Sequence, residues 1–204
     1  MKSADMFLHT LLTPQVQEAQ RHYYGRTYGV SKEAPLPDEL TDGEREFIES
    51  RNSFYISCTT EDGWPYIQHR GGTRGFLRVT GPSELMFADY GGNRQLITVG
   101  SLATNSRVCL FLMDYAARER LKLLGHADVF DTRQHPHLVV QSTPPGGHSG
   151  PVERVIVIRL VAYNWNCSKF IPPLVAPDGL DPIVNPLKPH LAELEGQFDP
   201  ARSS

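Results

Sequence analysis

Short apolar strand patterns, separated by tight-turn residues, fill the middle of this 204-residue chain and constrain its fold most strongly. Residues 53–59 read SFYISCT, which is rich in β-branched and aromatic residues, and Asp62 and Gly63 follow shortly after. Because Asp-Gly accepts the positive φ that tight turns need, we expect a hairpin with residues 64–69. Further strands are expected at residues 75–80, 84–89, 107–114, 120–129 and 154–165. Short strands joined by tight turns predict an antiparallel barrel with peripheral helices.

Three regions follow from this pattern. Residues 1–52 are expected to form a helical segment that packs on the barrel, and residues 53–167 the barrel itself. Residues 168–204 are expected to form a proline-rich stretch and a terminal helix near residues 187–197.

Helix-start signals stand at two places in the first region. Pro14 suits the first turn of a helix over residues 14–28. Thr41 and Glu44 have the spacing of a capping box, which predicts a helix that continues to about residue 51.

Charge and cysteine content exclude several classes of protein. The chain has 20 basic and 23 acidic residues, and a net charge of -3 argues against a nucleic-acid coat or a polybasic membrane anchor. Cys58, Cys109 and Cys167 are far apart in the sequence, so neither a disulfide framework nor a zinc site is expected. The apolar runs are too short to span a bilayer, and the amino-terminal residues lack a signal-peptide pattern. We therefore expect a cytoplasmic protein.

No dinucleotide-binding or P-loop glycine motif is present in the sequence. The run 147–151, GHSGP, has a proline where a nucleophile elbow needs glycine, so we interpret it as a loop. His135 and His137 lack the further ligands of a metal site, and we interpret them as surface residues at a helix start. We expect no metal.

The segment 88–95, ADYGGNRQ, is the first candidate for binding an anion. It leaves a strand, passes two glycines and enters an expected helix with Asn93, Arg94 and Gln95 in its first turn. A helix N-terminus offers free N–H groups and a partial positive charge, which disfavours arginine there unless an anion such as phosphate is bound. A solvated arginine on an ordinary turn is the alternative.

Further cationic residues stand at the ends of other strands. Residues 68–75, QHRGGTRG, place Arg70 and Arg74 among glycines, which suits an anion or a solvent-facing hairpin loop equally. Arg120 and Lys122 share one face of a strand, a pattern that also protects exposed strands from edge pairing. Trp165 ends the last long strand, where core packing is the common role.

Together these segments resemble the pyridoxamine 5'-phosphate oxidase-like, FMN-binding split-barrel superfamily. The resemblance covers roughly residues 47–167 and rests on the runs GWPYIQHRGGTRGFLRV, LMFADYGGNRQ, RERLKLLGHADV and YNWNC, in that order. It implies a mainly β, six-stranded antiparallel split β-barrel with peripheral helices. It also implies a homodimer with FMN at the subunit interface.

The resemblance also implies which residues contact the cofactor. Arg70 matches the arginine that opens the first flavin-contacting stretch, and Arg94 lies in the run that holds the FMN phosphate. Arg120 stands where the oxidases have a glutamine, and Trp165 resembles their late tryptophan. The expected FMN contacts are Gln68, His69, Arg70, Ala88, Asp89, Asn93, Arg94, Gln95, Arg120, Lys122 and Trp165. No catalytic residue is assigned.

Two departures narrow the expected function. Gln95 replaces the family's phosphate-binding lysine, and the motif that grips the pyridoxal substrate has no counterpart. We therefore expect an uncharacterised FMN-binding relative, an FMN-dependent oxidoreductase acting on an unidentified small molecule. The alternatives are a non-catalytic flavin-binding or sensor protein, and a split barrel that binds haem or a deazaflavin. The apolar strands 108–113 and 155–160 independently favour a dimer.

Overall fold

The computed structural model describes residues 5–29, 33–165, 169–172, 174, 186–187 and 189–190. The chain forms two compact units. Met1–Met113 with Arg120–Cys167 make up the first, and Asp114–Glu119 with Ser168–Ser204 the second. The second unit includes a short turn in which the Ala117 N–H donates to the Asp114 carboxylate at 2.8 Å.

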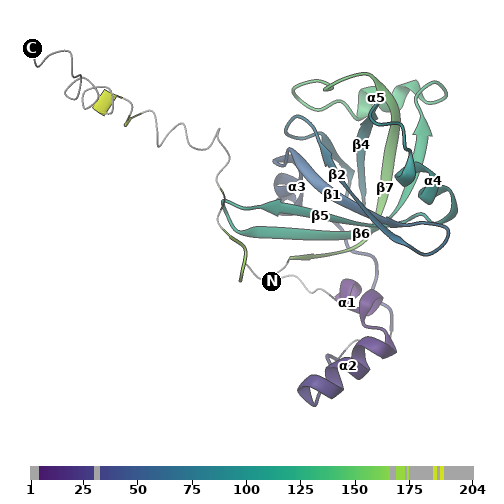
Figure 1. Cartoon of the computed structure of the whole chain (residues 1–204), viewed down its shortest axis with the longest axis vertical. Coiled ribbons are helices and arrows are strands. Elements are labelled where there is room, and N and C mark those ends of the chain that lie inside the picture. Colours follow the sequence, from purple (N-terminus) through teal and green to yellow (C-terminus); the bar gives the residue numbers. More distant parts are fainter. Residues whose placement is uncertain are drawn as a thin grey trace, which may run out of the picture. The chain divides into compact units, whose positions relative to one another are not determined.

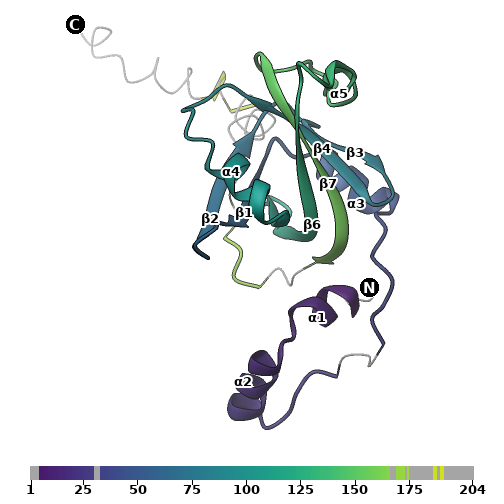
Figure 2. The same ribbon diagram turned by 90° about the vertical axis from the view of Figure 1, so that its right-hand side faces the viewer.

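Seven strands of the described residues form one sheet in the order β2-β1-β5-β6-β7-β4-β3. Figure 1 labels all of them except β3, which Figure 2 labels. Their bounds are β1 Ser53–Thr59, β2 Pro65–Gly71, β3 Leu77–Gly81, β4 Glu84–Tyr90, β5 Arg107–Asp114, β6 Glu119–Asp131 and β7 Val152–Trp165. The mainly β, antiparallel split-barrel class is confirmed, with seven strands where the resemblance implied six.

The β1–β2 hairpin forms as its turn residues predict. Gly63 has a φ of 85°, and its N–H donates to the Thr60 carbonyl at 2.9 Å. The two strands then pair over their full length, from Ser53 opposite Gly71 to Thr59 opposite Pro65. The register fixes which side chains of β2 point to the same face of the sheet.

The inward faces of the strands form the main core. Leu121 and Leu123 of β6 are fully buried, whereas Arg120 and Lys122 are half-buried on the other face of the strand, as the alternation predicts. Core side chains also come from β1, β3, β4, β5 and β7.

Strand β7 is buried on both faces from Val155 to Ile158. Ile156 and Ile158 belong to the main core, while Val155 and Val157 pack in a second cluster that includes Leu138 of α5 (Pro136–Gln141). The apolar surface of β7 that favoured a dimer in the sequence is therefore covered within the chain.

Three helices precede the sheet: α1 (Asp5–Leu11), α2 (Pro14–Tyr24) and α3 (Asp42–Glu49). Helix α2 stops earlier than predicted because Gly25, with φ 67°, ends it in the left-handed conformation. The capping box at the start of α3 is confirmed. Helix α1, which the sequence analysis did not predict, contacts β7.

Two sequence predictions fall largely or wholly outside the described residues. They are Cys167 and, apart from residues 187, 189 and 190, the helix near residues 187–197. Among the described residues, no helix has the length and apolar character needed to cross a membrane.

Candidate functional site

A cavity of about 360 Å³ lies where β2, β4 and β7 meet the start of α4 (Ile97–Thr104). We call it the arginine cavity, because Arg70, Arg94 and Arg154 line it. Six of the residues that the sequence analysis selected as cofactor contacts line this cavity: Gln68, Arg70, Asp89, Asn93, Arg94 and Gln95.

Strand alternation decides which residues of β2 reach the cavity. Gln68 and Arg70 lie on one face with Tyr66, and all three are half-buried. His69 lies on the opposite, exposed face, where its ring contacts Tyr55 with centroids 5.5 Å apart. Within one chain, His69 is therefore separated from the cavity by the strand itself.

Helix α4 lies beside β1 and β2 (Figure 2), and one hydrogen bond joins its first turn to β2. The hydroxyl of Thr98, which is 2% exposed, donates to the Gln68 side-chain oxygen at 2.9 Å. This bond orients the Gln68 amide and fixes the first turn of α4 at the cavity wall.

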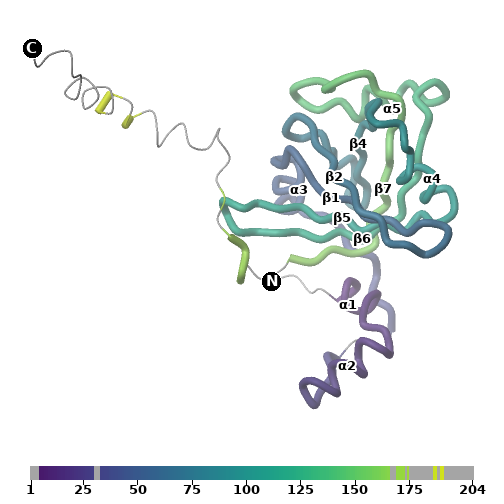
Figure 3. Tube along the Cα trace, viewed as in Figure 1, coloured from purple at the N-terminus to yellow at the C-terminus, as the bar shows by residue number. Residues whose placement is uncertain are grey.

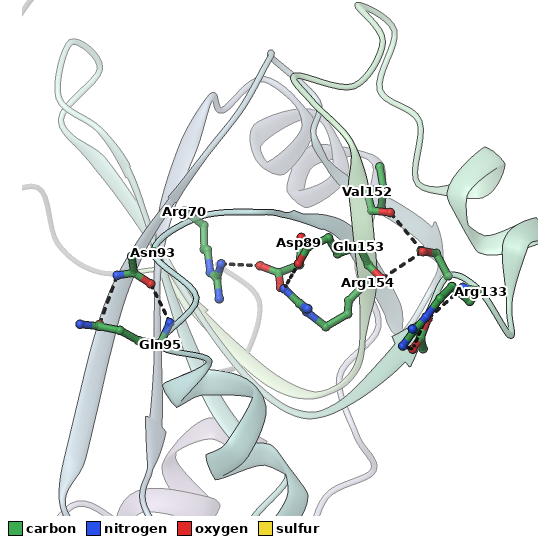
Figure 4. A network of polar contacts seen from close by, with 10 residues as sticks. Arg70, Asp89, Asn93, Gln95, Arg133, Val152, Glu153 and Arg154 are labelled. Atoms are coloured by element: carbon green, nitrogen blue, oxygen red, sulfur yellow. Dashed lines mark hydrogen bonds and ion pairs between the residues drawn. The ribbon is translucent and has the colours of Figure 1, made fainter.

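A buried carboxylate joins two arginines at the centre of the site (Figure 4). Asp89, on β4 and 4% exposed, accepts from Arg70 Nη1 at 2.6 Å through Oδ1 and from Arg154 Nε at 2.8 Å through Oδ2. Arg154 comes from β7, where it is opposite Asp89 in the strand register. Arg154 Nη2 also lies 2.9 Å from the Glu153 carboxylate.

These contacts keep Arg154 charged. Burial by itself would lower the pKa of Arg154, but the hydrogen bonds and charges of Asp89 and Glu153 raise it above its usual value. Arg154 is therefore a permanent cation at the junction of β4 and β7.

Arg70 has a buried donor without a partner. Its Nε is inaccessible to solvent and makes no hydrogen bond within the described residues. Buried donors are almost always satisfied in folded proteins, so an unpaired one in a cavity wall indicates that a ligand or an ordered water completes it.

The turn between β4 and α4 differs from the sequence prediction (Figure 3). We expected Asn93, Arg94 and Gln95 in the first helical turn, but α4 begins at Ile97 and all three precede it. Arg94 and Leu96 have φ values of 60° and 54°, a conformation in which the helix cannot extend backwards. The Asn93 side chain accepts from the Gln95 N–H at 3.1 Å and so closes a local turn in competition with the helix.

Arg94 is exposed at the mouth of the cavity and makes no hydrogen bond or ion pair with any residue that the structure describes. The N-terminus of α4 has no side-chain cap. Free N–H groups of the first turn and an unpaired guanidinium therefore stand on the same side of the cavity.

The remaining predicted contacts lie elsewhere. Ala88 is buried in β4 beside the cavity without lining it. Trp165 packs on α3, where its Nε1 donates to Glu44 at 2.9 Å and its ring meets that of Phe47 edge-on.

Arg120 and Lys122 lie at the same end of the sheet as Trp165. In the register of β6 and β7, Leu121 is opposite Trp165 and Asp131 is opposite Arg154. The eleven steps from Arg154 to Trp165 measure at most about 36 Å along the strand, at 3.3 Å per residue. Within one chain, Arg120, Lys122 and Trp165 lie toward the far end of this strand pair and do not line the arginine cavity.

Sequence reasoning missed Arg154, Glu153 and the two tyrosines of the cavity, Tyr66 and Tyr90. Arg154 carries no local motif: it precedes an apolar run and reaches the site through the pairing of β7 with β4, 65 residues away from Asp89 in sequence. Only the alternation of β2 could have added Tyr66 to Gln68 and Arg70.

The comparisons with known proteins agree with this architecture. The family model described as pyridoxamine 5'-phosphate oxidase matches residues 40–160, which is more than half of the chain. The chain therefore belongs to this family. No curated protein matches it.

Three solved structures with similar folds are distant in sequence. HupZ of Group A Streptococcus is 12% identical with a TM-score of 0.49, over 67% of this chain and 98% of that one. A putative pyridoxamine 5'-phosphate oxidase from Lactobacillus delbrueckii is 18% identical with a TM-score of 0.48, over 62% and 93%. An FMN-binding protein from Syntrophomonas wolfei is 11% identical with a TM-score of 0.43, over 60% and 83%. Similarities at this level carry no argument about the ligand of this chain.

Proposed function

We propose that this protein binds FMN and is an FMN-dependent oxidoreductase that acts on a small molecule. The observation that carries the proposal is the buried, unpartnered Nε of Arg70 in the wall of a cavity that two further arginines line. Membership of the pyridoxamine 5'-phosphate oxidase family supports a flavin as the ligand.

The residues of the cavity fit the phosphate end of FMN. Arg94 is free to turn toward the cavity, Arg70 has an unused donor there, and the first N–H groups of α4 are uncapped. Asn93 and Gln95 add amide groups at the same mouth. A phosphate monoester would be held by charge-assisted hydrogen bonds from such donors.

FMN, when bound, supplies hydride or electron transfer, and the protein supplies binding, orientation and electrostatics. A cation near the flavin ring would stabilise the negative charge that develops on reduction. We assign this role to Arg120 or Lys122 of the partner subunit.

The assignment to a partner subunit follows from the length of β7. Arg94 lines the cavity at the Arg154 end of the β6–β7 pair, whereas Arg120 lies at the Trp165 end, up to about 36 Å away along the strand. A homodimer with FMN between its protomers would let both groups of predicted residues contact one cofactor. His69 and Trp165, which are outside the arginine cavity, would contribute in the same way.

The first test is purification without added cofactor, followed by an absorption spectrum and identification of any small molecule released on denaturation. Two broad bands and a yellow colour support FMN, one intense band would indicate haem, and mass spectrometry separates FMN from a deazaflavin. Anaerobic reduction by nicotinamide cofactors, followed by turnover with candidate acceptors, distinguishes an enzyme from a sensor. Slow reduction by every donor would favour the sensor.

The second test is the substitution Arg94→Ala. Loss of a charged hydrogen bond to phosphate costs about 1.5–3 kcal/mol, so FMN binding should weaken by about 10- to 150-fold. The control is Arg107→Ala, which removes another exposed arginine outside the arginine cavity. If the Arg94→Ala protein stays fully yellow after dialysis, the phosphate assignment is wrong.

A further inference from the structure

We propose that Arg154 is a third anion-binding arginine of the arginine cavity, beside Arg70 and Arg94, and that Asp89 is a positioning residue which aims the guanidinium groups of Arg70 and Arg154. The identity of the anion, a flavin phosphate, rests on the proposed function. The roles of the two residues rest on the geometry of β2, β4 and β7.

Asp89 is unsuited to contact an anion itself. Its carboxylate is 4% exposed, and each of its oxygens already accepts a hydrogen bond from a different arginine. A second negative group beside it would be repelled unless cations stand between the two. We infer that the Asp89 carboxylate instead holds Arg70 and Arg154 in the orientation in which they bind the anion.

Both guanidinium groups keep donors for a ligand. An arginine has five N–H donors, and Asp89 takes one from Arg70 and one from Arg154. Glu153 accepts from Arg154 Nη2 at 2.9 Å, which leaves Nη1 of Arg154 without a contact among the described residues. The side chains of Arg70 and Arg154 are 17% and 19% exposed, so a ligand would meet them where water screens charge only weakly.

The net positive charge of the cavity depends on Arg154. Arg70, Arg94 and Arg154 face Asp89 and Glu153, which leaves a formal charge of about +1 on the lining residues. Without Arg154, the charges of the two remaining arginines and of the two carboxylates would sum to zero. The cavity therefore needs Arg154 in order to carry a net positive charge that attracts a phosphate.

The position of Arg154 also extends the site. Arg154, Glu153 and Val99 also line a second cavity of about 790 Å³, together with residues of α4, β6 and β7. Arg154 therefore borders both cavities.

The test compares FMN with riboflavin, which differ only by the phosphate, in the full-length protein. We expect Arg154→Ala to weaken FMN binding by about 10- to 100-fold and riboflavin binding by less than about twofold. The matched control is Arg159→Ala on the same strand: Arg159 pairs with Asp128 at 2.8 Å and does not line the arginine cavity. Arg154→Lys should restore part of the FMN preference, because it keeps the charge but loses the paired geometry.

Asp89→Asn tests the positioning role. The substitution makes the cavity more positive by one charge, so an argument from charge alone predicts tighter FMN binding. If Asp89 positions the arginines, FMN binding weakens by about tenfold in spite of the added charge, while riboflavin binding changes little. Circular dichroism checks whether Asp89→Asn is folded. If it is unfolded, the inference is judged on the ratio of FMN affinity to riboflavin affinity in Arg154→Ala.

Thermal-shift titration with inorganic phosphate separates this inference from the proposed function. If the wild-type protein binds phosphate but no flavin, and Arg154→Ala abolishes the phosphate effect, the inference stands and the proposed function fails. If the protein binds FMN and Arg154→Ala keeps the FMN-to-riboflavin ratio of Arg159→Ala, the inference is wrong and the proposed function stands. Binding of neither phosphate nor FMN by the wild type overturns both.

Discussion

Glu44 holds the start of α3 to the end of β7, and its removal makes a sharp test of this part of the structure. The carboxylate of Glu44 is 7% exposed, and it accepts from the Thr41 N–H at 3.0 Å, from the Thr41 hydroxyl and from Trp165 Nε1 at 2.9 Å. In Glu44→Gln, one oxygen becomes an NH2 group that faces N–H and O–H donors.

The expected loss follows from these contacts. A hydrogen bond to a charged acceptor contributes about 1.5–3 kcal/mol, and a capping interaction about 1 kcal/mol. Because the glutamine keeps one acceptor oxygen, we expect the free energy of unfolding at pH 7 to fall by about 2–4 kcal/mol. Glu46→Gln, an exposed position on the same helix, should change it by less than about 0.5 kcal/mol.

The effect should depend on pH in a defined direction. Burial raises the pKa of Glu44, but the hydrogen bonds from Thr41 and Trp165 together lower it by more than burial raises it. The pKa in the folded protein therefore lies below its usual value. The carboxylate therefore stabilises the fold fully above the unfolded-state pKa of about 4.3, and the stabilisation is lost as the pH falls through the folded-state pKa. Wild type and Glu44→Gln should converge toward pH 3.

Urea denaturation, followed by tryptophan fluorescence, measures this difference at several pH values. A Trp64→Phe background leaves Trp165 as the reporter, since the chain has two tryptophans and Trp64 is 74% exposed. A destabilisation of the same size at pH 7 and pH 3.5 would refute the reasoning, because it would show that the charge of Glu44 contributes nothing.

Three further predictions concern other elements. Gly125→Ala should destabilise the protein by about 1–3 kcal/mol in thermal unfolding, because a Cβ there would lie 2.6 Å from the Arg159 carbonyl oxygen. The control is Gly100→Ala in α4, where a Cβ would have no atom within 4 Å, and it should be neutral or stabilising. Thr98→Val should cost about 0.5–1.5 kcal/mol in the same assay, because it leaves the Gln68 oxygen without its donor; Thr80→Val, at an exposed hydroxyl on β3, is the control. Burial raises the pKa of Cys109 by more than the charge of Lys122 lowers it, so alkylation of Cys109 should be slow at pH 7.5 and become faster as the pH rises. In Lys122→Gln the alkylation should be slower still, and peptide mass spectrometry measures both rates. A rate for Cys109 equal to that of a small free thiol at pH 7.5 would contradict the third prediction.

Local chemistry allowed much of the fold to be predicted. The strands at 53–59 and 107–114 have the bounds that their alternation indicates, and the capping box of α3 forms at Thr41. In each case the signal lies within a few residues: side-chain periodicity, or a cap that satisfies backbone N–H groups nearby.

The candidate site was predictable only in part, for two physical reasons. The start of α4 was misplaced because Arg94 and Leu96 adopt positive φ, which non-glycine residues rarely do, although Gly91 and Gly92 stand directly before them. Arg154 was missed because its role comes from strand pairing between β4 and β7. Such long-range pairing is set by the whole sheet and leaves no local pattern.

The place of β7 in the strand order has a consequence for biosynthesis. Among the described strands β7 is the last to be made, yet it lies between β6 and β4 and so joins β2-β1-β5-β6 to β4-β3. Until residue 165 has left the ribosome, these two part-sheets have no bridge, and the facing edges of β4 and β6 have open hydrogen-bonding groups. At about 5–20 residues per second, the nascent chain spends seconds with these edges unpaired after β6 is complete. We expect aggregation of the chain, or its binding by chaperones, to occur in that interval.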